Sequence, residues 1–340
     1  MAKASLSPTS GLMTFGFSDG FGDRRRADMT KPLKKILNPR EVAAYYELQR
    51  VATEYGYGVH IKMRLADVFP VEKSGIAAEL YTFALRSHFD FVVSGEAHDP
   101  LFAVEFDGPS HRDDQRKRDA KKNELCKIFS FPLLRINTRH LVQKYNKASL
   151  LRWIISAWEL QKAFCEAQNK GQMPLDEDFD PIFLWHAGNT VEEVHPHWIA
   201  LKPRLHLKKL QEQDRIPVAY TCGFTFLDDG NNYHGIEWID VNNGKVIFVE
   251  SGMREQRFPL YLGELFSELM TVLLHDKLIE FLSSGEGSVD PWVVTKRLNE
   301  LRRLYRFAGS HSGSTKVNFS LSLGRSTSRF GDTVPSRTAR

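Results

Sequence analysis

Two acidic residues, Asp90 and Glu105, each lie inside an apolar stretch and are the strongest candidates for chemistry in this sequence. Asp90 lies within the run 88–93 and Glu105 within the run 104–108, with fourteen residues between the two acids. An acid in an apolar strand carries a desolvation penalty, and two neighbouring carboxylates repel each other unless a cation lies between them. A hard ion such as Mg²⁺ or Mn²⁺ prefers oxygen ligands, activates water and polarises a phosphoryl group. The pair therefore predicts a metal-assisted hydrolytic site, whereas either acid alone is more often a turn or salt-bridge residue.

The elements that must position these acids follow from the hydrophobic periodicity. Asn38 is a good N-cap with Pro39 and Glu41 in the first turn, so a helix begins there. The alternating stretch 59–65 predicts a strand, and 89–93 with 101–106 predict a hairpin. A helix at 113–129, a strand at 131–136 and a helix at about 147–169 follow. This order is most simply built as an α/β fold, a hairpin-containing mixed sheet flanked by helices.

The length of 340 residues suggests about two domains, and charge divides the chain further. The net charge of +4 conceals two basic ends, since residues 1–37 carry seven bases and three acids and residues 309–340 carry five bases and one acid. Both ends are rich in Ser, Gly and Arg, so we expect a disordered basic arm at 1–35 and a disordered basic tail at 309–340. The body between them is mildly acidic.

The second half of the chain has a different character from the first. Polar, acidic residues 171–180 predict a linker between a domain at 36–170 and a smaller α+β domain at 181–308. In the latter we expect a hairpin of 235–241 with 245–250 and helices at 260–282 and 291–307. The histidines at 186, 195, 197 and 206 form a weak metal-site candidate. The three separated cysteines and the absence of a long apolar run favour a cytoplasmic protein that spans no membrane.

Six ordered motifs in the first domain together resemble a known nuclease superfamily. They are Asn38-Pro39-Arg40-Glu41, Lys62…Arg64-Leu65-Ala66-Asp67-Val68, His88-Phe89-Asp90-Phe91-Val92, Val104-Glu105-Phe106-Asp107-Gly108-Pro109-Ser110-His111, Arg118-Asp119-Ala120-Lys121-Lys122-Asn123 and Pro132-Leu133-Leu134-Arg135-Ile136. The pattern resembles the PD-(D/E)XK superfamily, in the branch related to very-short-patch-repair endonucleases. That branch includes an uncharacterised bacterial family with an E…D…ExDG…H…D..K…LLRI pattern. The resemblance covers about residues 36–140 and implies a restriction-endonuclease-like core.

The resemblance also implies a role for each matching residue. Asp90 is the central metal ligand, Glu105 the second acidic ligand, and the Phe106 carbonyl a third. Glu41 reaches the same metal edge or orients a metal-bound water. Asp107 stands where the superfamily has a lysine, which fits this branch but leaves that lysine's work unassigned.

Three further groups of residues are candidates around the metal edge. His111 could orient the attacking water or protonate the leaving oxygen, or it could simply cap the next helix. Lys122, or Lys121, could supply the missing cation, although a basic helix face is usually just solvated. Contacts to nucleic-acid phosphates are expected from Arg112, Arg116, Lys117 and Lys121.

These observations favour a Mg²⁺- or Mn²⁺-dependent nuclease that hydrolyses phosphodiester bonds of DNA. The smaller domain would then recognise DNA, a protein partner or another copy of the chain. The alternative is a nuclease fold without activity that binds nucleic acid or protein, as the missing lysine suggests. A third interpretation has the smaller domain acting alone, with the first domain as its scaffold.

Overall fold

The computed structural model describes residues 33–107, 113–142, 144–145, 148–182, 184, 186–311, 313 and 315–318. The chain divides between Ile36 and Leu37, and all elements described below belong to residues 37–340. The predicted basic arm at 1–35 lies almost wholly outside the described residues. The described helices include none that is long and apolar enough to cross a membrane.

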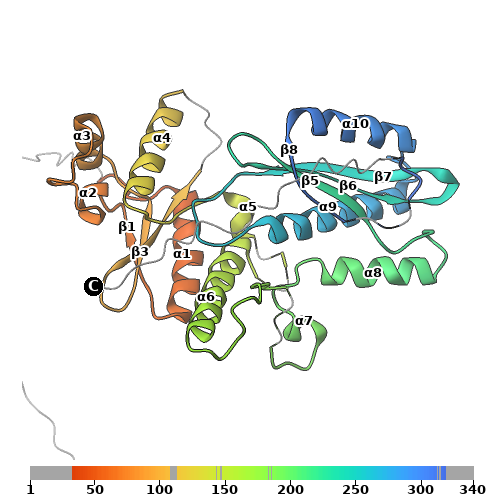
Figure 1. Ribbon diagram of the computed structural model, residues 1–340, viewed down its shortest axis with the longest axis horizontal. Helices are drawn as coiled ribbons and strands as arrows, with labels where there is room; N and C mark the ends of the chain where they lie inside the picture. Colours follow the sequence, from red (N-terminus) through yellow and green to blue (C-terminus); the bar gives the residue numbers. More distant parts are fainter. Residues whose placement is uncertain are drawn as a thin grey trace, which may run out of the picture. The chain divides into compact units, whose positions relative to one another are not determined.

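The first of two sheets is built from the strands that the sequence predicts (Figure 1). Its order is β1-β2-β3-β4. The strands are β1 (Gly58–Ile61), β2 (Phe91–Ser94), β3 (Pro100–Phe106) and β4 (Leu133–Ile136). The pairs β1/β2 and β2/β3 are antiparallel, and β3/β4 is parallel with α4 (Asp113–Ile128) as the connection between them. The remaining helices of this half are α1 (Pro39–Glu54), α2 (Leu65–Val68), α3 (Ala78–Arg86), α5 (Thr138–Leu141) and α6 (Leu150–Asn169).

Helices cover both faces of this sheet, and the alternation of buried side chains shows which face each helix covers. Phe91, Val93, Phe102 and Val104 pack in one cluster with α1 and α6. Val92, Ala103 and Leu133 pack in a second cluster with α2, α3 and α4. Because side chains alternate along a strand, every second residue of β2, β3 and β4 faces α4. The result is a mixed α/β layer structure, as predicted.

The start of α1 is fixed by a complete capping box. Asn38 Oδ1 accepts from the backbone N–H groups of Arg40 and Glu41, and the Asn38 N–H donates to Glu41 Oε2 at 2.9 Å. Pro39 follows at the first helical position, where its missing N–H costs nothing. Glu41 is thereby held in one orientation.

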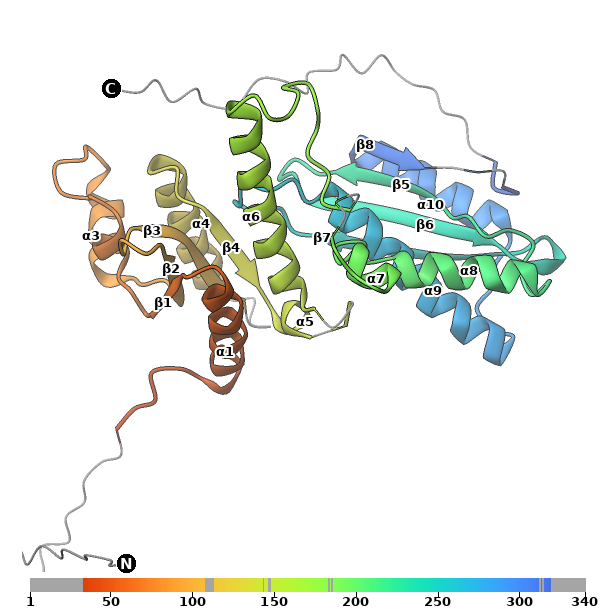
Figure 2. The ribbon, with the colours of Figure 1, turned by 90° about the horizontal axis from the view of Figure 1, so that it is seen from below.

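The second sheet is wholly antiparallel, in the order β7-β6-β5-β8. Its strands are β5 (Cys222–Leu227), β6 (Tyr233–Asp240), β7 (Val246–Met253) and β8 (Arg306–His311), and a short 3₁₀ turn at Asn242–Gly244 joins β6 to β7. The helices are α7 (Val191–Val194), α8 (Leu201–Glu212), α9 (Gly263–Ser284) and α10 (Pro291–Leu304). Ile239 packs with α8 and α9, whereas Trp238 packs with α10, so α9 and α10 cover opposite faces (Figure 1). Helix α8 lies along α9 (Figure 2).

Ordered structure continues beyond residue 308, where the sequence predicts the disordered tail to begin. Strand β8 runs to His311, and Val317 is buried against the second sheet. Thr315 donates to Asp240 and accepts from the Trp238 indole N–H. The predicted start of the tail at residue 309 was therefore wrong. Most side chains of β8 are exposed or half-buried, so the strand has no apolar alternation by which the sequence could reveal it. The predicted helix 291–307 likewise ends earlier, at Leu304.

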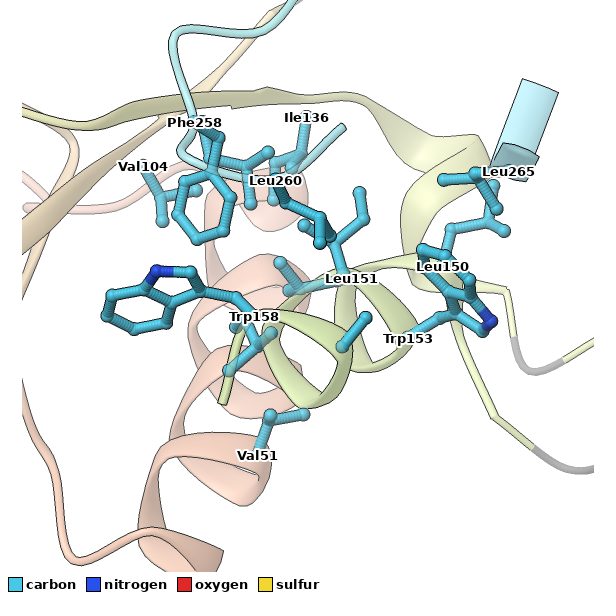
Figure 3. Close-up of a cluster of buried hydrophobic side chains, with 14 of the residues drawn as sticks. Val51, Val104, Ile136, Leu150, Leu151, Trp153, Trp158, Phe258, Leu260 and Leu265 are labelled. Carbon is cyan, nitrogen blue, oxygen red and sulfur yellow. The ribbon is translucent and has the colours of Figure 1, made fainter. Parts of the chain in front are cut away.

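The core does not stop at the predicted linker 171–180. Phe258 and Leu260, from the second half, are buried in the same cluster as Trp158 of α6 and Ile136 of β4 (Figure 3). Phe258 meets the rings of Phe102 and Trp158 with centroids 5.3 Å away in both cases. A separate function for residues 181–308 remains a prediction, but the two halves share buried side chains.

Candidate active site

Four charged residues form a row across the α4 face of the first sheet. In the β3/β4 register, Glu105 lies opposite Arg135. In the antiparallel β2/β3 register, Phe91 lies opposite Val104, so the preceding residue Asp90 lies opposite Glu105. Lys62 continues the row, since its N–H donates to the Asp90 carbonyl at 2.9 Å. Residues directly opposite each other point to one face, so the Asp90 and Glu105 carboxylates share a side of the sheet.

Asp90 is held by both of its carboxylate oxygens. Oδ1 accepts from Lys62 Nζ at 2.6 Å, and Oδ2 accepts from the Phe106 N–H at 2.9 Å. The same Lys62 ammonium donates to Glu41 Oε1 at 3.0 Å, so Glu41 is tied both to its own helix cap and to Asp90. The structure therefore places Glu41 near Asp90, through a lysine that sequence reasoning did not assign.

Lys62 has an unusual backbone. Its φ of 52° lies in the left-handed region, which costs a non-glycine residue of order 1–3 kcal/mol and persists only where the surroundings enforce it. The sequence predicts an unbroken strand over 59–65, but β1 ends at Ile61 and the chain turns at Lys62. With the backbone turned in this way, the Lys62 ammonium contacts both Asp90 and Glu41.

Glu105 is buried, and so is its partner Lys122 of α4. The Nζ of Lys122 donates to Glu105 Oε1 at 2.6 Å, and both side chains are less than one-tenth exposed. The pKa of Glu105 is raised to about 7, chiefly because the carboxyl is buried; the nearby Asp90 carboxylate adds to the shift and Lys122 opposes it. A carboxyl that titrates near neutral pH beside a second carboxylate is typical of a functional site.

Asp107 contacts two arginines. Its Oδ1 accepts from Arg135 at 3.1 Å and its Oδ2 accepts from Arg254 at 2.8 Å. Arg135 is buried and also donates to Asp119 and Asn123 of α4. The Asp107 carboxylate thus joins a buried arginine of the first sheet to an exposed arginine of the second half of the chain.

A cavity of about 940 Å³ is lined by the acids described above and by Lys122 and Arg254. Its acidic side chains are Glu41, Asp90, Glu105, Asp107 and Asp119, and its arginines are Arg40, Arg116, Arg118 and Arg254. His88 also lines it, and burial lowers the pKa of this imidazole, so it is neutral at pH 7. A lining that contains both carboxylates and arginines suits a cation together with an anionic ligand.

The donor set fits a hard divalent cation rather than a softer metal. The described residues contain no group of three or more His, Cys, Asp or Glu side chains arranged to hold a metal. The acid pair and a main-chain carbonyl at Phe106 are oxygen donors, and Mg²⁺ is commonly bound by one or two carboxylates with waters and substrate phosphates. The observation behind this fit is the placement of the two carboxylates, which face one side of the sheet and line the same cavity.

The predicted phosphate-binding residues separate into two groups. Arg116 lines the cavity, whereas the Lys121 ammonium pairs with Glu79 of α3 at 2.5 Å and Lys117 is exposed outside the lining. His111 and Arg112 lie outside the described residues. Among the other candidates, His186 lies near His197 with ring centroids 5.8 Å apart, and His206 hydrogen-bonds His275 instead.

Sequence reasoning missed four residues of this site. Lys62, His88 and Arg135 lie within the quoted motifs. Alternation with Asp90 could have placed His88 on the same face, whereas the position of Arg135 opposite Glu105 depends on the β3/β4 register. Arg254 has no such signal, since it is far along the chain and reaches the cavity only through the fold.

Comparison with known families reaches only part of the chain. Residues 33–152 match the model of a family described as a protein of unknown function, DUF2726. Neither the curated proteins nor the solved structures contain a significant match to this chain. The matched residues include the acid pair, Lys62, Lys122 and Arg135, whereas Arg254 lies outside them.

Proposed function

We propose that this protein is a divalent-metal-dependent nuclease that cleaves phosphodiester bonds of DNA, with a restriction-endonuclease-like core around the first sheet. The observation that carries the proposal is the acid pair. Asp90 and Glu105 lie opposite each other on one sheet face, and they line a cavity that is also lined by four arginines. A phosphodiester needs both features, a place for a cation and positive groups for its neighbouring phosphates.

In this proposal Asp90 and Glu105 hold Mg²⁺, with the Phe106 carbonyl as a further oxygen donor. When bound, Mg²⁺ polarises the phosphoryl group and activates water for attack. The chain supplies the remaining work. The Phe106 N–H and Lys62 fix the Asp90 carboxylate, and Lys122 fixes that of Glu105.

Two ammonium groups are candidates for the role of the absent motif lysine. Lys122 contacts Glu105 from α4, and Lys62 contacts Asp90 from the end of β1. Either can donate to a phosphate oxygen next to its acid, and Lys62 is the more exposed of the two. For proton transfer, His88 lies in the cavity lining, and burial lowers the pKa of its imidazole, so that it can accept a proton at neutral pH.

One observation favours the alternative, an inactive nuclease fold that binds nucleic acid or a protein partner. Each acid of the pair already has an ammonium partner at 2.6 Å, so the charges of Asp90 and Glu105 are balanced without a metal. A site that has lost its metal could be retained in this form.

The deciding experiment compares DNA cleavage in Mg²⁺, in Mn²⁺ and in EDTA. Single- and double-stranded DNA are incubated with the wild type, Asp90→Ala and Glu105→Ala, and with Glu79→Gln, which changes an exposed acid of α3, as the control. We expect cleavage in Mg²⁺ or Mn²⁺ by the wild type and the control only. Cleavage that persists in both site variants would sink the assignment, and binding without cleavage under all conditions would favour the alternative.

A further inference from the structure

A short segment of the second half lies against the free edge of β4 and brings one arginine to the cavity. We name residues 254–258 the edge segment. Strand β4 pairs with β3 on one side only, and the edge segment occupies the other side. There the Leu133 N–H donates to the Arg257 carbonyl at 2.7 Å, and the Arg135 N–H donates to Gln256 Oε1 at 2.8 Å.

The edge segment is fixed at several points, so the position of Arg254 is defined. Gln256 and Phe258 are buried, and Phe258 packs edge-on to Phe102 of β3. The Glu255 N–H donates to Asn232 Oδ1 at 3.1 Å, which ties the segment to the turn before β6. A residue next to so many anchors has little freedom in its backbone.

The Arg254 side chain is not buried by this packing. Its side chain is 47% exposed, and Nη1 donates to Asp107 Oδ2 at 2.8 Å. Among the described residues, Asp107 is the one hydrogen-bond partner of the Arg254 guanidinium. The other donors of the fork remain available at the cavity, while Asp107 fixes the orientation of the group.

We infer that Arg254 is a substrate-contacting residue that binds a backbone phosphate of DNA beside the acid pair. The inference rests on the proposed function and extends it, since Arg254 lies outside the family-matched residues 33–152. A guanidinium held by one carboxylate and open on its other side matches a phosphate in bidentate geometry. The second half of the chain thus contributes directly to substrate binding at this site.

The test is the salt dependence of DNA binding by the full chain. Fluorescence anisotropy with a labelled DNA duplex, in EDTA to prevent cleavage, gives Kd over roughly 50 to 200 mM KCl. The variants are Arg254→Ala, Arg254→Lys and, as a matched control, Arg303→Ala on the exposed side of α10. Thermal unfolding checks that each variant is folded, and Arg254→Gln replaces Arg254→Ala if the latter is not.

We expect Arg254→Ala to weaken binding by roughly five- to tenfold and to reduce the slope of log Kd against log salt by about 0.9, the value for one phosphate contact. Arg254→Lys should retain most of the slope because it keeps the charge, and Arg303→Ala should match the wild type. A purely structural role for Arg254 would leave the slope unchanged.

The outcomes separate this inference from the proposed function. If the wild type binds DNA and Arg254→Ala has the same slope of log Kd against log salt, the inference alone is overturned. It is also overturned if Arg303→Ala reduces that slope as much as Arg254→Ala does. A wild type that shows no salt-dependent binding of duplex DNA and no cleavage would overturn both.

Discussion

The buried carboxyl of Glu105 makes the stability of this protein depend on pH. Burial raises its pKa from the ordinary 4.5 to about 7. Between these values the folded protein keeps a proton that the unfolded chain has lost, so the free energy of unfolding falls as the pH rises. This contribution is fully present below pH 4.5 and is lost as the pH rises through 7. The difference between 4.5 and about 7 corresponds to about 3 kcal/mol.

Glu105→Gln isolates this contribution, because the amide stays neutral and its oxygen can still accept from Lys122. Urea unfolding of the wild type and the variant, measured from pH 4.5 to pH 8, gives the difference in unfolding free energy at each pH. We expect the wild type to lose about 3 kcal/mol relative to Glu105→Gln across this range. Glu79→Gln on α3 serves as the exposed control and should run parallel to the wild type. A constant difference between wild type and Glu105→Gln would refute the reasoning, since it would mean that Glu105 titrates alike in both states.

Three further substitutions test other parts of the structure. Lys62→Met removes the ammonium that competes with a metal for Asp90, so Mn²⁺ should bind roughly tenfold more tightly in isothermal titration calorimetry; weaker binding would contradict the competition. Asn38→Ala removes the capping box of α1 and should cost about 1 kcal/mol in urea unfolding, with no loss if the cap is unimportant. Phe258→Ala should cost about 3–5 kcal/mol because the ring is buried, whereas Phe307→Ala, at a half-exposed ring, should cost far less.

The parts of this structure that could be predicted are those with a local signal. Asp90 and Glu105 stand out because each interrupts an apolar strand, and the period of two along adjacent strands then places them on one face. Helix α1 was predictable from Asn38, Pro39 and Glu41, which form the cap observed. In these cases the sequence around each residue is enough to predict its local structure.

The missed features depend on contacts between distant residues or on unusual backbone. Lys62 reads as the polar side of a strand, and nothing in a lysine predicts a left-handed φ of 52°. Strand β8 has little apolar pattern because it lies at the edge of the second sheet, where pairing with β5 defines it. Arg254 reaches the cavity only because Phe258 and Gln256 pack against the first sheet.

The edge of β4 that the edge segment covers limits where this protein can be truncated. Residues 133–136 are all buried, and the edge segment covers backbone groups that would otherwise be open to another strand. A fragment that ends after residue 152 would expose this apolar edge, and exposed edges of that kind template intermolecular pairing. Such a fragment should therefore aggregate, whereas a chain that retains 254–260 should stay monodisperse. The edge segment thus prevents β4 from pairing with a strand of another molecule.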